Sequence, residues 1–132
     1  MLSVGESVSA IAHRAMRRLT KQVERVVLAD LPKPPRIPKI ARRLGVSERN
    51  LRKVFESVHG LPPNKYLRLF RLSLARRALM SARSRSVSVS KVATSLGFPQ
   101  LGRFSVEYRE SFGESPSETL GLAVRKYERR RG

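Results

Sequence analysis

Residues 41–63, ARRLGVSERNLRKVFESVHGLPP, and residues 93–116, ATSLGFPQLGRFSVEYRESFGESP, are two copies of one pattern. Two copies are too few for a solenoid, which needs about three repeats or more, so the pattern predicts two similar lobes. The corresponding positions, which lie 52 or 53 residues apart, are Ala41 and Ala93, Gly45 and Gly97, Leu51 and Phe104, Phe55 and Tyr108, Gly60 and Gly113, and Pro63 and Pro116.

Each copy predicts a helix, a tight turn and a second helix. In the first copy, apolar residues recur at helical spacing over residues 37–44, and Gly45 favours the left-handed conformation that ends a helix. Ser47 is a good N-cap for the helix that follows. In the second copy, Ser88 can cap the first helix and Gly97 can end it. A helix, a short turn containing glycine and another helix form the helix-turn-helix motif.

The segments around the two copies also predict helices. Residues 8–29 form an amphipathic pattern whose apolar face begins with Val8 and Ile11. Residues 63–83 predict a long helix between the copies. On the buried face of that helix we place Tyr66, Phe70, Leu74, Ala78 and Leu79.

These elements predict an all-α fold. Two helix-turn-helix subdomains, each a three-helix lobe similar to a homeodomain, are joined by a long central helix. The expected parts are an N-terminal amphipathic helix and Pro-rich link at residues 1–35, a first helix-turn-helix at 36–62, a connecting helix and loop at 63–87, a second helix-turn-helix with a final short helix at 88–124, and a frayed basic tail at 125–132.

The charge of the chain points to a polyanionic partner. The chain carries 28 Lys and Arg residues against 10 Asp and Glu residues, which gives a net charge of +18 and an isoelectric point near 11.7. An isoelectric point above about 9 is typical of nucleic-acid-binding domains. RNA-binding modules usually present aromatic side chains to unstacked bases, whereas aromatic residues are only 6% of this chain and most fall on buried helix faces. We therefore expect double-stranded DNA as the partner.

The same composition argues against an enzyme. The chain has no Cys, two histidines, His13 and His59, and one aspartate, Asp30. A metal site needs several such ligands close together, and a catalytic His needs a nucleophile or carboxylate partner. We therefore expect no catalytic residue, no metal and no cofactor. The start of the chain has no export-signal pattern, and no run approaches the roughly 20 apolar residues of a membrane span. We expect a cytoplasmic, nucleoid-associated protein that does not bind membranes.

The second helix of each copy has an outward face suited to DNA. Recognition helices insert such faces into the major groove, where Arg can bind guanine, and Asn or Gln adenine, with two hydrogen bonds each. A basic helix face is usually only solvated, but two copies in a chain of charge +18 favour DNA recognition. The outward residues are Arg49, Asn50, Arg52, Lys53 and Glu56 in the first copy, and Gln100, Gly102, Arg103, Ser105, Val106 and Arg109 in the second.

Two longer stretches carry a family resemblance. They are IARRLGVSERNLRKVFESVHGLPPNKYLRLFRLSLARRAL and, above all, VATSLGFPQLGRFSVEYRESFGESPSETL. The second is similar to the pattern A-x-x-x-G-F followed by F-x-x-x-[YF]-[RK]-x-x-F-G-x-x-P-S. Over about residues 36–122 the chain resembles the DNA-binding region of the AraC/XylS family of bacterial transcriptional regulators. The resemblance implies two lobes that bind adjacent major-groove segments on one face of the duplex. It also implies activation of transcription through contact with RNA polymerase.

The resemblance also implies base-contacting positions. In the second lobe these depart from the polar set that many relatives carry, because Gly102 offers no side chain and Leu101 and Val106 offer only apolar contact, for instance to a thymine methyl. We expect this lobe mostly to hold the DNA backbone, apart from Arg103 and Gln100. The positions are Arg49, Asn50, Arg52 and Lys53 in the first lobe, and Leu101, Gly102, Arg103, Ser105 and Val106 in the second.

Alternatives to a specific regulator remain at this point. The main one is an architectural DNA-binding protein of the nucleoid type with little sequence preference. An enzyme acting on nucleic acid is disfavoured because the chain lacks clustered carboxylates and metal ligands. Most relatives also carry an N-terminal sensing or dimerisation domain, for which 132 residues leave no room. The chain is therefore either a short stand-alone member or a fragment, and the long first helix that starts abruptly near Val8 favours a fragment. We expect it to bind DNA as a monomer through its two recognition helices, whereas the full-length protein could be a dimer.

Overall fold

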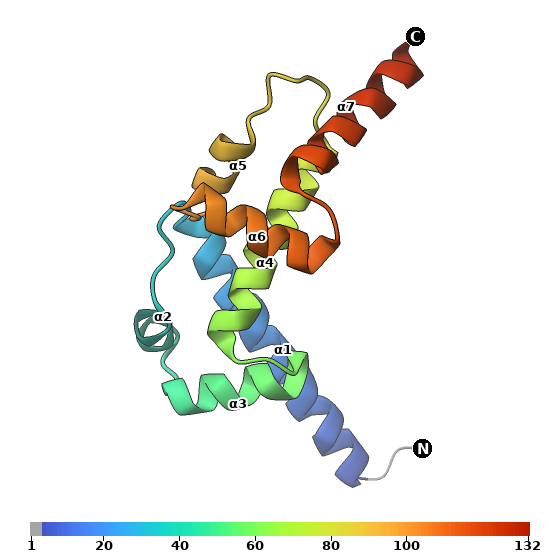
Figure 1. Ribbon diagram of the computed structural model, residues 1–132. Coiled ribbons are helices and arrows are strands. Elements are labelled where there is room, and N and C mark those ends of the chain that lie inside the picture. The colour runs from blue at the N-terminus through green and yellow to red at the C-terminus, as the bar shows by residue number, and fades with distance from the viewer. Residues whose placement is uncertain (1–3) are drawn as a thin grey trace. The chain divides into compact units, whose positions relative to one another are not determined.

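The computed structural model describes residues 4–132, which fold into α-helices in two compact units (Figure 1). The first unit contains α1 (Val4–Ala29), α2 (Ile37–Leu44), α3 (Glu48–His59) and the start of α4 (Pro63–Met80). The second unit contains α4 from Arg68 onward, α5 (Val89–Ser95), α6 (Leu101–Phe112) and α7 (Pro116–Arg131). Residues 4–132 contain no strand, so the predicted all-α class with two helix-turn-helix pairs, α2–α3 and α5–α6, is confirmed. None of the described helices is long and apolar enough to span a lipid bilayer.

The core of the first unit lies where α1 packs on α2 and α3. Val23 and Val27 of α1 are buried there with Ile40 of α2 and with Leu51 and Phe55 of α3. Burial of a side chain of this size is worth about 1.5–3 kcal/mol. This cluster therefore fixes which face of α3 is turned inward and leaves the opposite face free.

The apolar face of α1 is covered only along part of the helix. α1 begins at Val4 rather than at residue 8, and its 26 residues span about 39 Å. The helices that pack against it, α2 and α3, have only 8 and 12 residues and do not cover that whole length. Val8 and Ile11, which we expected at the start of the buried face, are therefore 60% and 57% exposed.

A second core holds the second unit together. Its one fully buried hydroxyl is satisfied, because Tyr108 Oη donates to Thr119 Oγ1 at 2.7 Å and Thr119 Oγ1 donates to Glu114 Oε2 at 2.7 Å. A buried hydroxyl without a partner would cost free energy, so this chain of hydrogen bonds lets a tyrosine occupy the centre of the core. The buried residues are Leu72, Ala75, Leu79, Ala93, Phe98, Phe104 and Tyr108.

The buried face of α4 differs from the prediction. The helix ends at Met80 instead of residue 83, and Leu79 is the one predicted position that is fully buried. The reason is that α4 supplies residues to two cores, so its buried positions do not follow the single stripe that periodicity predicts. Tyr66, Phe70 and Leu74 are only partly buried and Ala78 is exposed, whereas Leu67, Leu72, Ala75 and Leu79 are buried.

The last helix is longer than predicted. We expected a short helix to about Val124 and a frayed tail, but α7 continues to Arg131. Arg, Lys and Glu are good helix formers, and basic side chains stabilise the C-terminal end of a helix by interaction with its dipole. The Arg83 guanidinium also lies 5.7 Å from the ring centroid of Tyr127, which gives the extension a contact outside α7.

Candidate nucleic-acid interface

The turn between α2 and α3 is formed by Gly45, Val46 and Ser47. Gly45 has a φ of 69°, a left-handed conformation that residues with a Cβ rarely adopt. The N–H of Val46 donates to the carbonyl of Ala41 at 3.0 Å. The Ser47 hydroxyl accepts a hydrogen bond from the N–H of Asn50 at 3.0 Å and so caps α3. The predicted helix stop and cap are both confirmed.

The outward face of α3 carries the predicted polar residues. Leu51 and Phe55 hold the helix in the core, and the opposite side chains extend into solvent. Two arginines on this face can each donate a pair of hydrogen bonds to guanine, and the asparagine can bind adenine. The exposed residues are Arg49, Asn50, Arg52, Lys53 and Glu56.

The face of α3 has two flanks. One flank borders a groove of about 440 Å³ between α3 and α1. Arg49 and Arg52 do not line this groove. Asn50 and Lys53 therefore lie beside α1, while the two arginines form the flank away from it. The groove is lined by Ala15, Met16, Leu19, Asn50, Lys53, Val54 and Ser57.

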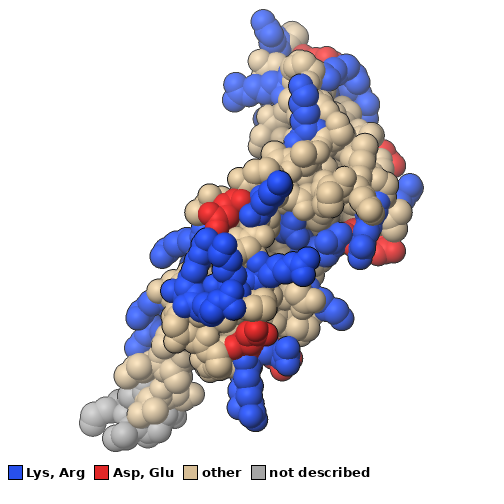
Figure 2. Space-filling view, turned by 90° about the vertical axis from the view of Figure 1, so that its left-hand side faces the viewer, with Lys and Arg blue, Asp and Glu red and all other residues tan. Residues whose placement is uncertain are grey.

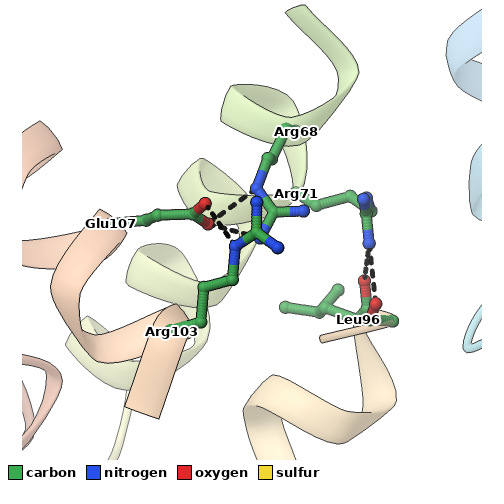
Figure 3. Close-up of polar contacts among 6 residues, drawn as sticks. Arg68, Arg71, Leu96, Arg103 and Glu107 are labelled. Atoms are coloured by element: carbon green, nitrogen blue, oxygen red, sulfur yellow. Dashed lines mark hydrogen bonds and ion pairs between the residues drawn. The ribbon is translucent and has the colours of Figure 1, made fainter. Parts of the chain in front are cut away.

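An arginine from α4 holds the turn between α5 and α6. Arg71 donates from Nη1 to the carbonyl of Leu96 at 3.1 Å and to that of Gly97 at 2.9 Å (Figure 3). Its guanidinium also lies 4.7 Å from the ring centroid of Phe98. Burial, together with the charge of the neighbouring Arg68, lowers the pKa of Arg71, although the guanidinium remains charged. The turn that begins the second recognition helix is thus fixed to α4.

The outward face of α6 is less polar than that of α3. Leu101 is 44% exposed and Val106 is 58% exposed. Apart from its chain neighbours and the adjacent backbone of α6, no atom lies within 4 Å of the point where a Cβ on Gly102 would be. Gln100 precedes the helix without capping it through its side chain, so its amide can bind DNA. Ser105 is only partly exposed.

The two arginines on this face have acidic neighbours. Arg103 Nε lies 3.4 Å from Glu107 Oε1, and Arg109 Nη2 lies 3.9 Å from Glu118 Oε1. Both arginine side chains are more than 60% exposed. Exposed ion pairs contribute only about 0–1 kcal/mol, so phosphates or base edges can displace or share these contacts.

Basic side chains are spread over both units. Figure 2 shows one face of the molecule, on which Lys and Arg side chains are widespread and Asp and Glu are few. This distribution agrees with a net charge of +18. A surface of this kind attracts the phosphate backbone of nucleic acids over distances of about a Debye length.

The two histidines have different surroundings. His59 stacks on Tyr66 with a centroid distance of 3.8 Å, and Tyr66 Oη donates to Glu24 Oε2 at 2.7 Å. Burial lowers the pKa of His59, an effect that the charge of Glu24 partly opposes, so its imidazole is neutral at pH 7. His13 is exposed on α1. Within residues 4–132 no three His, Cys, Asp or Glu side chains lie together in a way that could hold a metal ion.

Three residues have structural roles in the second unit that the sequence did not predict, namely Arg68, Arg71 and Glu107. The carboxylate of Glu107 lies between the guanidinium groups of Arg68 and Arg103 (Figure 3). The i, i+4 spacing of Arg103 and Glu107 is visible in the sequence. The pairing of Glu107 with Arg68 joins residues 39 positions apart, and periodicity carries no information on which face of α4 meets α6.

Comparison with known proteins identifies this region. Residues 40–121 match a family model described as a helix-turn-helix domain. The chain is 38% identical over 92 residues to the "Probable thc operon regulatory protein" of Rhodococcus erythropolis. It is 40% identical over 77 residues to the "XylDLEGF operon transcriptional activator 2" of Pseudomonas putida. The alignments cover 70% and 58% of this chain but 28% and 49% of those relatives, so the chain spans about a quarter to a half of their length.

A solved structure agrees with these relatives. The crystal structure of a probable AraC family transcriptional regulator from Rhodopseudomonas palustris has a TM-score of 0.67 and 36% identity, over 80% of this chain and 97% of that chain. The family and the relatives are transcriptional regulators and not enzymes, and no comparison supports a nucleoid-type architectural protein. The chain therefore belongs to the AraC/XylS family of bacterial transcriptional regulators and contains its sequence-specific DNA-binding region.

Proposed function

We propose that the chain binds one double-stranded DNA site as a monomer, with α3 and α6 in adjacent segments of the major groove. The observation that carries this proposal is that each unit fixes its second helix in a core on one side and exposes arginines on the other. These arginines are Arg49 and Arg52 on α3, and Arg103 and Arg109 on α6. Two recognition helices in one chain remove the need for the two-fold symmetric dimer that single-motif proteins use.

The two helices have different roles in this proposal. On α3, the guanidinium and amide groups select bases, because they can form paired hydrogen bonds with guanine and adenine. On α6, Arg103 and Gln100 select bases while Arg109 contacts phosphate. The proposed DNA-contacting residues are Arg49, Asn50, Arg52 and Lys53 on α3, and Gln100, Leu101, Gly102, Arg103, Ser105, Val106 and Arg109 at α6.

The proposal extends to regulation of transcription in the bacterial cytoplasm. The names of two relatives describe an operon regulator and an operon activator. We assign to this protein an activating role at promoters, with RNA polymerase as a second partner. The family resemblance supports this assignment, and binding at a promoter would place the protein next to the polymerase.

Selection of bound sequences from a random duplex pool at physiological salt tests the proposal. We expect enrichment of one asymmetric site of about 20 base pairs, because two adjacent major-groove segments occupy about two helical turns. Sedimentation of the complex should give one protein chain per duplex. A double variant, Arg52→Ala with Arg103→Ala, should enrich no defined site. Recovery of a palindrome bound only by two chains, or of no sequence preference at all, would overturn the proposal.

A further inference from the structure

Glu107 lies at the point where the second recognition helix meets α4. It follows Arg103 by one turn on α6, and its carboxylate lies between two guanidinium groups that come from different helices (Figure 3). Arg68 of α4 donates from Nε to Glu107 Oε2 at 2.6 Å. Arg103 of α6 donates from Nε to Glu107 Oε1 at 3.4 Å. Each carboxylate oxygen therefore has its own arginine.

The contact with Arg68 fixes the carboxylate. Both Nε and Nη2 of Arg68 reach the same oxygen of Glu107, and charge-assisted hydrogen bonds of this kind are about twice as strong as neutral ones. The Glu107 side chain is only 22% exposed. The Arg68 guanidinium in turn lies 5.4 Å from the ring centroid of the buried Phe98. Glu107 is thus held by a guanidinium that itself packs on a core residue of the second unit.

The contact with Arg103 is longer and involves only its Nε atom. The Arg103 side chain is 69% exposed, and the carboxylate touches it at Nε. Because the carboxylate contacts only Nε, the two terminal Nη groups of Arg103 remain available to donate the paired hydrogen bonds that guanine O6 and N7 accept. The carboxylate therefore restrains the arginine without blocking the atoms that would bind the base.

We propose that Glu107 is a positioning residue for DNA recognition, which holds Arg103 in the orientation that binds guanine. This inference rests on the proposed base contact of Arg103. A free arginine side chain loses rotamer freedom when it binds, at a cost equivalent to about 2- to 10-fold in affinity, and a side chain restrained beforehand loses less. Glu107 thereby sharpens the preference of the second unit for guanine at one position.

The negative charge of Glu107 opposes binding to DNA of any sequence. An effect of Glu107 on base preference can therefore be distinguished from its effect on overall affinity. A carboxylate on a DNA-facing helix repels phosphates at every sequence, so its removal raises affinity for all DNA alike. Glu110 is exposed on the same helix one turn further on and supplies a matched control of equal charge. Glu107 differs from Glu110 in its contacts with Arg68 and Arg103, so a change of base preference at Glu107 alone reports on these contacts.

The test compares the base preferences of Glu107→Gln, Glu110→Gln and Arg103→Ala with that of the original chain, each measured by selection from a random duplex pool. We expect Arg103→Ala to remove discrimination of about 10- to 100-fold at one guanine of the site. Glu107→Gln should lower discrimination at that same guanine by about 2- to 10-fold, and it should raise affinity for unrelated DNA. Glu110→Gln should raise affinity for unrelated DNA to a similar extent and leave the guanine preference unchanged.

A second variant keeps the charge constant. Glu107→Asp is one methylene shorter and cannot span both Arg68 and Arg103, so it should lower guanine discrimination without changing affinity for unrelated DNA. Thermal unfolding of each variant identifies a temperature at which all are folded, and the comparison is made there. A purely structural role of Glu107 would lower the unfolding temperature and leave the preference profile intact.

The outcomes separate this inference from the proposed function. Loss of guanine preference in Arg103→Ala together with full preference in both Glu107 variants would overturn the positioning role and leave base contact by Arg103 standing. Higher guanine discrimination in Glu107→Gln would show that the carboxylate competes with DNA, which also overturns it. An unchanged profile in Arg103→Ala would overturn base contact by Arg103 and the positioning role with it.

Discussion

The two helix-turn-helix units share a backbone plan and differ in what their second helices expose. In both units a left-handed glycine lies in the turn, Gly45 in the first and Gly97 in the second. A buried aromatic residue then fixes the second helix, Phe55 on α3 and Phe104 on α6. The outward face of α3 is charged and polar, whereas that of α6 includes a glycine at position 102 and two exposed apolar side chains.

This difference separates the requirements of folding from those of recognition. The positions that recur between the copies are those where a core or a turn demands a particular residue, whereas the outward-facing positions of the second helices, such as Arg52 and Ser105, diverge. The surroundings of the two second helices also differ, since α3 borders a groove with α1, while α6 is joined to α4 by the ion pair between Arg68 and Glu107. We therefore expect the first unit to supply most of the sequence specificity and the second to supply mainly affinity.

Salt should have the largest effect, because it acts on the backbone contacts of both units. A protein that neutralises about 6–10 phosphates gives a log–log slope of about −5 to −9 and loses about 10³- to 10⁵-fold in affinity between 50 and 200 mM salt. Titrations by fluorescence anisotropy at several salt concentrations measure the slope. If α6 mainly holds the backbone, Arg109→Ala should make the slope shallower by about 1 without changing the base preference. A slope for the original chain shallower than about −2 would contradict contact by two units.

A break in α4 should cost the next largest amount, because this helix supplies core residues to both units. Leu74→Pro removes a backbone hydrogen bond from the helix interior and introduces a clash, at a cost of about 3 kcal/mol or more. We expect affinity for the selected site to fall by more than about 100-fold while weak binding to unrelated DNA persists. Leu74→Ala keeps the helix and serves as the control. A Pro variant with unchanged helix content by circular dichroism and full affinity would refute a connecting role for α4.

Single arginines test the comparison between α3 and α6 directly. Arg52→Ala should cost about 1–3 kcal/mol on the selected site and relax the preference at particular bases. Arg103→Ala should also relax the preference, though by less in total, because fewer base-selecting groups surround it on α6. Arg130→Ala, on α7, is the control and should weaken binding to all sequences slightly and equally. Equal, sequence-independent losses from all three would refute base recognition by either helix.

The features of the fold that depend on neighbouring residues in the chain were predictable. The caps at Ser47 and Ser88 and the helix stop at Gly45 follow from local hydrogen bonding and backbone conformation, and the structure confirms all three. The covered length of α1 and the buried face of α4 were not predictable, because they depend on which helices lie against them. Periodicity identifies an apolar stripe on a helix but does not indicate how many other helices pack against it or how far along it they extend.

The candidate site was predictable to the same extent. The outward residues of α3 follow from its apolar spacing, since a core on one side determines the other side. The ties that hold α6, from Arg71 to the turn and from Arg68 to Glu107, join residues 25 and 39 positions apart. Such pairs depend on the packing of α4 against α5 and α6, which no local pattern in the sequence encodes.

The glycine on α6 gives the smallest expected effect and the finest test of the comparison. Gly102 is exposed within a helix, and a Cβ there would meet no atom within 4 Å other than those of its chain neighbours and the adjacent backbone of α6. Gly102→Ala should therefore raise the free energy of unfolding by about 1 kcal/mol, measured by urea unfolding followed by circular dichroism. Gly113→Ala is a matched control, because the space around it is equally open but its φ of 76° is unfavourable for alanine, so that variant should lose about 1–2 kcal/mol. If α6 mainly holds the DNA backbone, Gly102→Ala should leave the base preference unchanged. A more stable variant that nevertheless loses affinity for the selected site would mean that α6 approaches the bases too closely at position 102 to admit a methyl group. The second unit would then contribute to specificity as directly as the first.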